Sequence, residues 1–151
     1  MPATLIPRVR IEEVEYFLSL AWGGGGGVIR GNGVAGAVVA QVPVSMKVDV
    51  GTLRGFIANR MVRNATTTAT GDITAPTGGS AGDLRRIDLI QYSLTGGVNI
   101  KEGTEDPAPV PPSADANSLV LAHIYCRKGM VSVKDTDDSA NGYISDQRTY
   151  I

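Results

Sequence analysis

The chain has 151 residues, of which 42% are hydrophobic and 19% charged, with a formal net charge of −1 at pH 7 and one cysteine. This length suits one compact domain with a buried core. The near-neutral charge provides no basic field for nucleic acid, no apolar run reaches the roughly eighteen residues of a membrane span, and a single cysteine excludes an internal disulfide.

Nineteen glycines and eight prolines, together with many threonines and valines, favour an all-β fold with many turns over a helical bundle. The N-terminal sequence has two early prolines and carboxylates where a signal peptide requires an apolar core. We therefore expect the chain to remain in the cytoplasm in which it is made.

Residues 1–43 are predicted to form an N-terminal arm and a glycine-rich segment. Residues 11–22 are ambiguous, because their apolar spacing suits a helix or a strand. Pro7 before them and glycine after them favour an extended arm or strand. The five glycines at 23–27 are interpreted either as a flexible loop or as a contact where neighbouring subunits approach closely.

Residues 44–151 are predicted to form a β-domain. Apolar and polar residues alternate over 44–50, which indicates a half-buried strand. Residues 56–62 are its predicted hairpin partner, across a turn at Gly51–Thr52. Strands are also predicted at 84–92 and 98–101, joined by a hairpin turn at 95–97.

The last third begins with residues 103–116, whose four prolines predict an extended connector with little sheet pairing. An apolar strand at 119–125, a turn at Lys128–Gly129, a strand at 130–134 and an Asp- and Asn-rich loop follow. Seven to nine short strands without a βαβ rhythm predict an antiparallel β-sandwich or barrel.

The chemistry-bearing residues do not predict an enzyme. The only histidine, His123, lies three residues before Cys126, so a strand directs the two side chains to opposite faces. Residues 135–146 have the oxygen spacing of a calcium loop, but Ala140 replaces the required glycine and Asp146 the bidentate glutamate. A solvated turn is the better interpretation. The G-x-G-x-x-G at 31–36 lacks the helix that dinucleotide binding needs. We predict no metal and no cofactor.

Several different short motifs follow one another along the chain. Val-Asp-Val-Gly-Thr at 48–52 precedes Arg-Gly-Phe at 54–56, and Gly-Asp-Leu-Arg-Arg-Ile-Asp-Leu-Ile stands at 82–90. Val-Asn-Ile-Lys-Glu-Gly-Thr at 98–104 leads into the prolines, and the strand at 119–125 is followed by a turn, a second strand and a closing Asp146-x-Arg148. This order, over residues 44–151, resembles a β-module of bacteriophage tail-fibre, baseplate and head-decoration proteins.

The resemblance implies an all-β virion structural protein that forms a homotrimer and contacts other virion proteins, such as the major capsid or tail proteins, after assembly in the host cytoplasm. It implies neither nucleic-acid nor membrane binding. The end of the chain at Ile151 favours a capsid decoration (cement) protein. A tail-fibre or baseplate adaptor, or a minor tail protein, is the alternative. A host-receptor or carbohydrate-binding module ranks third and should offer an aromatic-lined groove.

The predicted interface has two parts. Residues 1–20 are expected to reach a neighbouring subunit and add a strand to an exposed sheet edge. Residues 119–124 are expected in the core or near the trimer axis. The candidate interface residues are Leu5, Ile6, Ile11, Phe17, Trp22, Leu119, Leu121 and His123.

Overall fold

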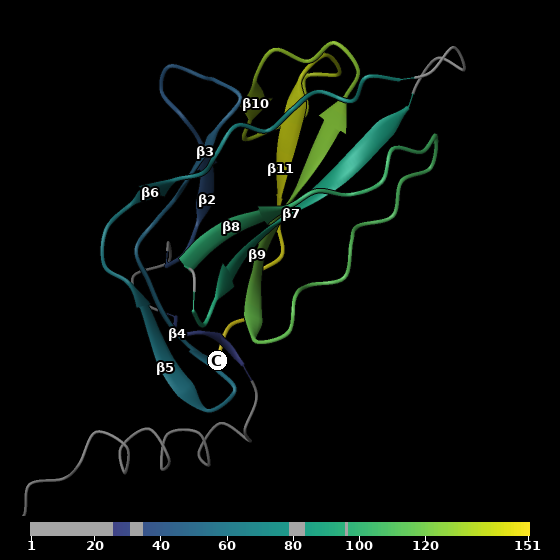
Figure 1. Cartoon of the computed structure of the whole chain (residues 1–151). Coiled ribbons are helices and arrows are strands. Elements are labelled where there is room, and N and C mark those ends of the chain that lie inside the picture. The colour runs from purple at the N-terminus through teal and green to yellow at the C-terminus, as the bar shows by residue number, and fades with distance from the viewer. Residues whose placement is uncertain (1–25, 31–34, 79–83, 96) are drawn as a thin grey trace, which may run out of the picture.

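The computed structural model describes residues 26–30, 35–78, 84–95 and 97–151 (Figure 1). These residues form eleven strands and no helix. The all-β class predicted from composition and alternation is therefore confirmed, with more strands than predicted because three of them contain only two residues. The described ranges accordingly contain no helix long and apolar enough to span a membrane. The predicted arm at 1–20 lies outside the described residues.

The largest sheet has five strands in the order β10-β11-β9-β7-β8. All its neighbouring pairs are antiparallel except β10 with β11. The predicted strands at 84–92, 98–101 and 119–125, and the hairpin between the first two, are confirmed in this sheet. Its strands are β7 (Arg85–Ser93), β8 (Gly97–Lys101), β9 (Ser118–Arg127), β10 (Val133–Lys134) and β11 (Gly142–Asp146).

Two smaller antiparallel sheets complete the sandwich, in the orders β1-β4-β5 and β2-β3-β6. The first contains β1 (Gly27–Val28), β4 (Leu53–Ile57) and β5 (Arg60–Asn64). The second contains β2 (Val38–Ala40), β3 (Val48–Val50) and β6 (Thr68–Ala69). The strands β1 and β2 precede residue 44 in the chain and pair with strands that follow it.

The predicted pairing of 44–50 with 56–62 is wrong. β4 instead forms a hairpin with β5, and β3 pairs with β2 and β6. The turn between β4 and β5 is Ala58–Asn59, and both residues have positive φ, 48° and 64°. Positive φ at both central residues is the geometry of a tight type I′ hairpin turn. Alanine rarely adopts a positive φ, so the sequence gives no sign of a turn at this position.

Two predicted strands are shorter than expected. Of residues 44–50 only Val48–Val50 is a strand, and of 130–134 only Val133–Lys134. The Ser45 hydroxyl donates to the Gln41 side chain at 2.7 Å and accepts from the Lys47 amide at 3.0 Å. Such local side-chain bonds compete with a strand ladder and hold this stretch as a loop.

One hydrophobic core lies between the large sheet and the two small ones. Because side chains alternate along a strand, one face of β7 and β9 fills this core and the other faces away from it. Each fully buried Val, Leu or Ile contributes about 1.5–3 kcal/mol. The buried members of this core include Val28, Val48, Val50, Leu53, Ile57, Val62, Ile73, Ile90, Leu119, Leu121, Ala122, Ile124, Cys126, Met130 and Val133.

Candidate functional site

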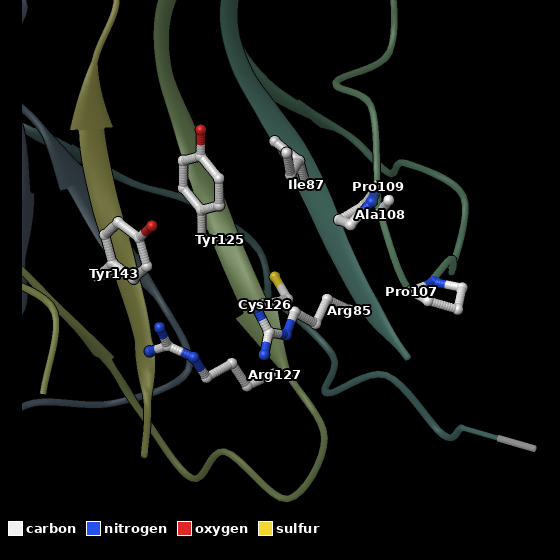
Figure 2. A pocket seen from close by; sticks show the side chains of 9 residues that line it. All are labelled: Arg85, Ile87, Pro107, Ala108, Pro109, Tyr125, Cys126, Arg127 and Tyr143. Atoms are coloured by element: carbon white, nitrogen blue, oxygen red, sulfur yellow. The ribbon is translucent and has the colours of Figure 1, made fainter. Parts of the chain in front are cut away.

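A cleft of about 320 Å³ lies on the large sheet, over β7, β9 and β11 (Figure 2). Ile124 and Cys126 of β9 are core residues, so the alternation places Tyr125 and Arg127 on the opposite face, where the cleft opens. Its lining is aromatic, apolar and cationic. The residues that line it are Arg85, Ile87, Pro107, Ala108, Pro109, Tyr125, Cys126, Arg127 and Tyr143.

Two tyrosines form one side of this cleft. Tyr125 of β9 and Tyr143 of β11 are directly opposite each other in the ladder. Their rings stack with centroids 4.7 Å apart and an angle of 4° between the planes. On its other side Tyr125 is paired in register with Ile87 of β7, and Figure 2 shows Pro107–Pro109 of the connector beyond that strand. The cleft is thus bounded by a tyrosine pair and by prolines.

Arg127 is held in place at one end of the cleft. Its guanidinium donates two hydrogen bonds of 2.7 Å to Asp137 and one of 2.8 Å to the carbonyl of Asn141. It also lies 5.1 Å from the centre of the Tyr143 ring. The hydrogen bond from Arg127 lowers the pKa of the Asp137 carboxyl, and the same bond raises the pKa of Arg127. The charge of Arg127 is therefore largely balanced by Asp137.

Arg85 provides the positive charge that is not balanced in this way. The backbone amide of Arg85 donates a hydrogen bond to the carbonyl of Asp106 at 3.1 Å, and the carbonyl of Arg85 accepts one from the Asp106 amide at 3.0 Å. The side chain of Arg85 is exposed. Within the described part of the chain, its guanidinium has no hydrogen-bond or ion-pair partner. A smaller adjoining hollow, of about 270 Å³, is lined by Arg85, Arg127 and Lys128 among others. Cationic side chains thus gather at this end of the cleft.

The proline-rich connector, residues 103–116, forms the wall opposite the tyrosines and is anchored near both ends. Near its start Glu105 accepts hydrogen bonds from the amides of Thr77 and Gly78, at 3.0 and 3.2 Å. Near its end Asp115 accepts from Gln91 and Lys101, both at 2.5 Å, and its amide donates to the Gln91 side chain at 3.0 Å. Gln91 is fully buried. The wall is therefore fixed at its end to β7 and β8, and near its start to the segment at Thr77–Gly78.

A buried ion pair supports the start of the connector from the core side of β7. Arg86 donates to Asp88 through two hydrogen bonds, of 2.7 and 3.0 Å, and also to Glu102. Asp88 further accepts from the amide of Gly103 at 3.0 Å. A Cβ on Gly103 would lie 2.1 Å from the carbonyl oxygen of Ile87, so only glycine fits there.

Cys126 lies beside this ion pair. Its sulfur is 3.5 Å from a carboxylate oxygen of Asp88, and the residue is completely buried. Burial, reinforced by the negative charge of Asp88, raises the pKa of the Cys126 thiol far above its ordinary value. The thiol therefore stays protonated and is a poor nucleophile at neutral pH.

The acidic loop after β10 is a hydrogen-bonded turn. One oxygen of Asp138 accepts from the amides of Ala140 and Asn141, at 3.0 and 2.7 Å, and the other lies 2.6 Å from the Lys134 amine. The hydrogen bond from Lys134 is the largest cause of the lowered pKa of Asp138. Among the described residues, no three His, Cys, Asp or Glu side chains are grouped so that they could hold a metal ion.

The candidate interface residues are distributed differently from the cleft. Leu119 and Leu121 are buried in the core of this chain. His123 is half-buried on the same face as Tyr125, between Leu89 and Ser145 in the ladder, and burial lowers its pKa. Leu5, Ile6, Ile11, Phe17 and Trp22 lie outside the described residues. A contact of these eight residues with another subunit stays a prediction.

The cleft itself was not predicted from the sequence. The two-residue period at His123, Tyr125 and Arg127 was the available signal, because it places these side chains on one face. It does not reveal that Tyr143 and Arg85 stand beside them, since strand pairing between distant segments has no local signature.

Comparison with known proteins found no matching family model, no matching curated protein and no matching solved structure.

Proposed function

We propose that this chain is a structural protein of a bacteriophage virion, a trimeric capsid decoration protein that stabilises the assembled particle through subunit contacts. The observation that supports this proposal is where the family-like motifs lie. The segments at 82–90, 98–104 and 119–125 and the closing Asp146-x-Arg148 belong to or adjoin β7, β8, β9 and β11, which are contiguous in one sheet. The first motif, at 48–56, lies instead in β3 and β4 of the two small sheets, so the resemblance extends over the whole sandwich.

The closing motif is also an integral part of the fold. Arg148 donates to Asp146 through two hydrogen bonds, of 2.8 and 2.5 Å, and to the carbonyl of Ala35 at 2.7 Å. Tyr150, two residues after Arg148, forms a β-bridge with Val28 of β1. This motif ties the last strand of the large sheet to the first strand of a small one, which suits a rigid building block.

A decoration protein acts through binding energy alone. A standard protein interface buries about 1,600 Å² in total, and repetition over a shell multiplies its effect. A protein that binds only the assembled state stabilises assembly by mass action. Exposed apolar side chains are available at one end of the sandwich, where the Val133 amide donates to the Ser45 carbonyl at 2.8 Å. Val42, Val44 and Val131, from the two loops that meet there, are 98%, 51% and 77% exposed.

A tail-fibre or baseplate adaptor, or a minor tail protein, is the alternative within the same class, because the same module serves tails. A host-receptor or carbohydrate-binding module is a second candidate function. The aromatic-lined cleft at Tyr125 and Tyr143 favours it, since such a groove is the expected feature of that class.

Particle labelling tests the proposal. Purified virions that carry this chain should bind an antibody against its β-domain, with gold particles over the head for a decoration protein and over the tail for an adaptor. A version without residues 1–20 should remain folded by circular dichroism but attach to depleted particles more weakly than the full chain. Virions free of this chain, or equal attachment of both versions, would contradict the proposal and the role of the arm, respectively.

A further inference from the structure

The shape and polarity of the Tyr125 cleft limit what it can hold. Ile87 is only 4% exposed, and Pro107 and Pro109 face the cleft as rigid apolar rings. A volume of about 320 Å³ is at the lower end for small-molecule sites. A ring-sized group with one apolar face therefore fits between the tyrosine pair and the connector.

The strands under the cleft are already paired with one another in the sheet. At Tyr125, β9 is paired with Ile87 of β7 and with Tyr143 of β11, and at Arg85, β7 is paired with β9 and bridged to Asp106 of the connector, so no long open edge runs along the cleft. A peptide that binds by adding a strand needs such an edge. A ligand in this cleft must be recognised by side chains alone.

The polar groups around the cleft suit a ligand with hydroxyls. The hydroxyls of Tyr125 and Tyr143 have no hydrogen-bond partner in the described ranges, and each can donate and accept. Burial is the largest cause of a raised pKa at Tyr143, which keeps its hydroxyl protonated. The tyrosine pair thus offers ring surface at its sides and hydrogen bonds at its tips.

The charge at the cleft suits one carboxylate. Arg127 is paired with Asp137, whereas Arg85 has no anionic partner among the described residues. A guanidinium binds a carboxylate through two parallel hydrogen bonds. The whole chain carries a net charge of −1, which disfavours a densely charged nucleic-acid strand.

We infer that the cleft between Tyr125 and the proline-rich connector binds a carboxylated sugar ring of an acidic polysaccharide. The apolar face of the ring packs on Tyr125 and on the proline rings of the connector, the sugar hydroxyls bond to the tyrosine hydroxyls, and the carboxylate pairs with Arg85. This site does not depend on the proposed virion role, because any β-domain of this structure would have it.

Nuclear magnetic resonance titration of the full chain tests this inference. The probes are trigalacturonate, trimannuronate and 3′-sialyllactose, with the neutral methyl ester of trigalacturonate as the matched control ligand. At least one acidic probe should shift the amide signals of Ile87, Tyr125 and Arg127 at millimolar concentration, and the methyl ester should bind about tenfold more weakly.

Two variants test whether the positive charge of Arg85 binds the carboxylate of the ligand. Arg85→Ala should weaken binding of the acidic probe about tenfold, and Arg85→Lys should retain part of it. Arg60→Ala removes an exposed arginine from β5, in another sheet, and should bind like the wild type. Thermal unfolding of all three variants checks that they are folded.

Several results would overturn the inference. They are no shift with any of the three acidic probes, equal binding of the methyl ester, equal binding by Arg85→Ala, or shifts confined to residues outside the cleft. An acetylated, amidated acidic peptide that binds in the cleft as tightly as the best sugar would also overturn it, and would identify a peptide site instead.

Discussion

Arg86 and Asp88 show how a charged pair can be kept inside this sandwich. Their side chains are only 3% and 2% exposed. Burial opposes the charged form of Arg86, but the hydrogen bonds and charge of Asp88 outweigh it and raise the pKa of the guanidinium. Thr74 accepts from Arg86 through its carbonyl at 2.8 Å, and Gly103 donates to Asp88. Such a pair is tolerated because its hydrogen-bonding groups have partners.

Removing one charge of this pair should therefore be costly. We expect Asp88→Asn to lower the free energy of unfolding by about 3 kcal/mol, because Arg86 is left without its buried counterion. Urea unfolding monitored by circular dichroism measures the change.

Asp72→Asn is the matched control for this substitution. The Asp72 carboxylate is 74% exposed and lies 3.7 Å from Lys47, so its loss should cost at most about 1 kcal/mol. If the two variants lose the same free energy of unfolding, the buried pair contributes no more to stability than the exposed one.

At the scale of elements, the proline-rich connector behaves as a structural wall although it contains almost no strand. Within residues 103–116, the only ladder contact in the described chain is the bridge of Asp106 with Arg85. Proline cannot donate to a ladder, which explains this. Carboxylates take over the anchoring, with Glu105 on the amides of Thr77 and Gly78 and Asp115 on Gln91 and Lys101.

This anchoring should depend on pH. The hydrogen bond from the Thr77 amide is the largest cause of the lowered pKa of Glu105, and that from Lys101 has the same effect on Asp115, against ordinary values of 4.5 and 3.8. A carboxyl group with a lowered pKa in the folded state stabilises the fold above its ordinary pKa. That stabilisation is lost as the pH falls through the lowered value.

Urea unfolding of the wild type and of a Glu105→Gln, Asp115→Asn double variant measures this effect. The wild type should be the more stable at pH 7, and the difference should shrink as the pH falls below about 5. The Asp72→Asn variant should show little such change. A difference that stays constant with pH would mean that these carboxylates do not anchor the connector through their charge.

At the scale of the whole molecule, the sandwich leaves apolar side chains on its surface. Val42, Val110 and Val131 are 98%, 76% and 77% exposed. Association of subunits is one way in which such side chains are removed from water. The resemblance to phage modules implies a homotrimer, and closed cyclic symmetry would bury equivalent surfaces on each subunit.

We therefore expect the purified chain to sediment at three times its monomer mass at micromolar concentration. Analytical ultracentrifugation over a dilution series measures this, and lower concentrations should shift the population toward the monomer. A monomer throughout the series would contradict the trimer, and a stable dimer would contradict it equally.

Much of the architecture could be predicted because its determinants are local. The pattern at 84–92 and the apolar run at 119–125 indicated strands, and the Thr95–Gly97 stretch indicated the hairpin between β7 and β8. The Ala58–Asn59 hairpin was missed because an alanine occupies a position that favours glycine or asparagine. The strand at 44–50 was overestimated because Ser45 and Gln41 bond to each other outside any ladder.

By itself, the sequence determined the all-β class, the strands β7, β8 and β9 of the large sheet and the loop character of the proline-rich connector. These follow from side-chain period and proline chemistry within a few residues. Only the tertiary structure decided that Tyr143 stacks on Tyr125 and that Arg85 stands beside Asp106. The physical reason is that register between distant segments is set by packing of the whole core, which no local pattern encodes.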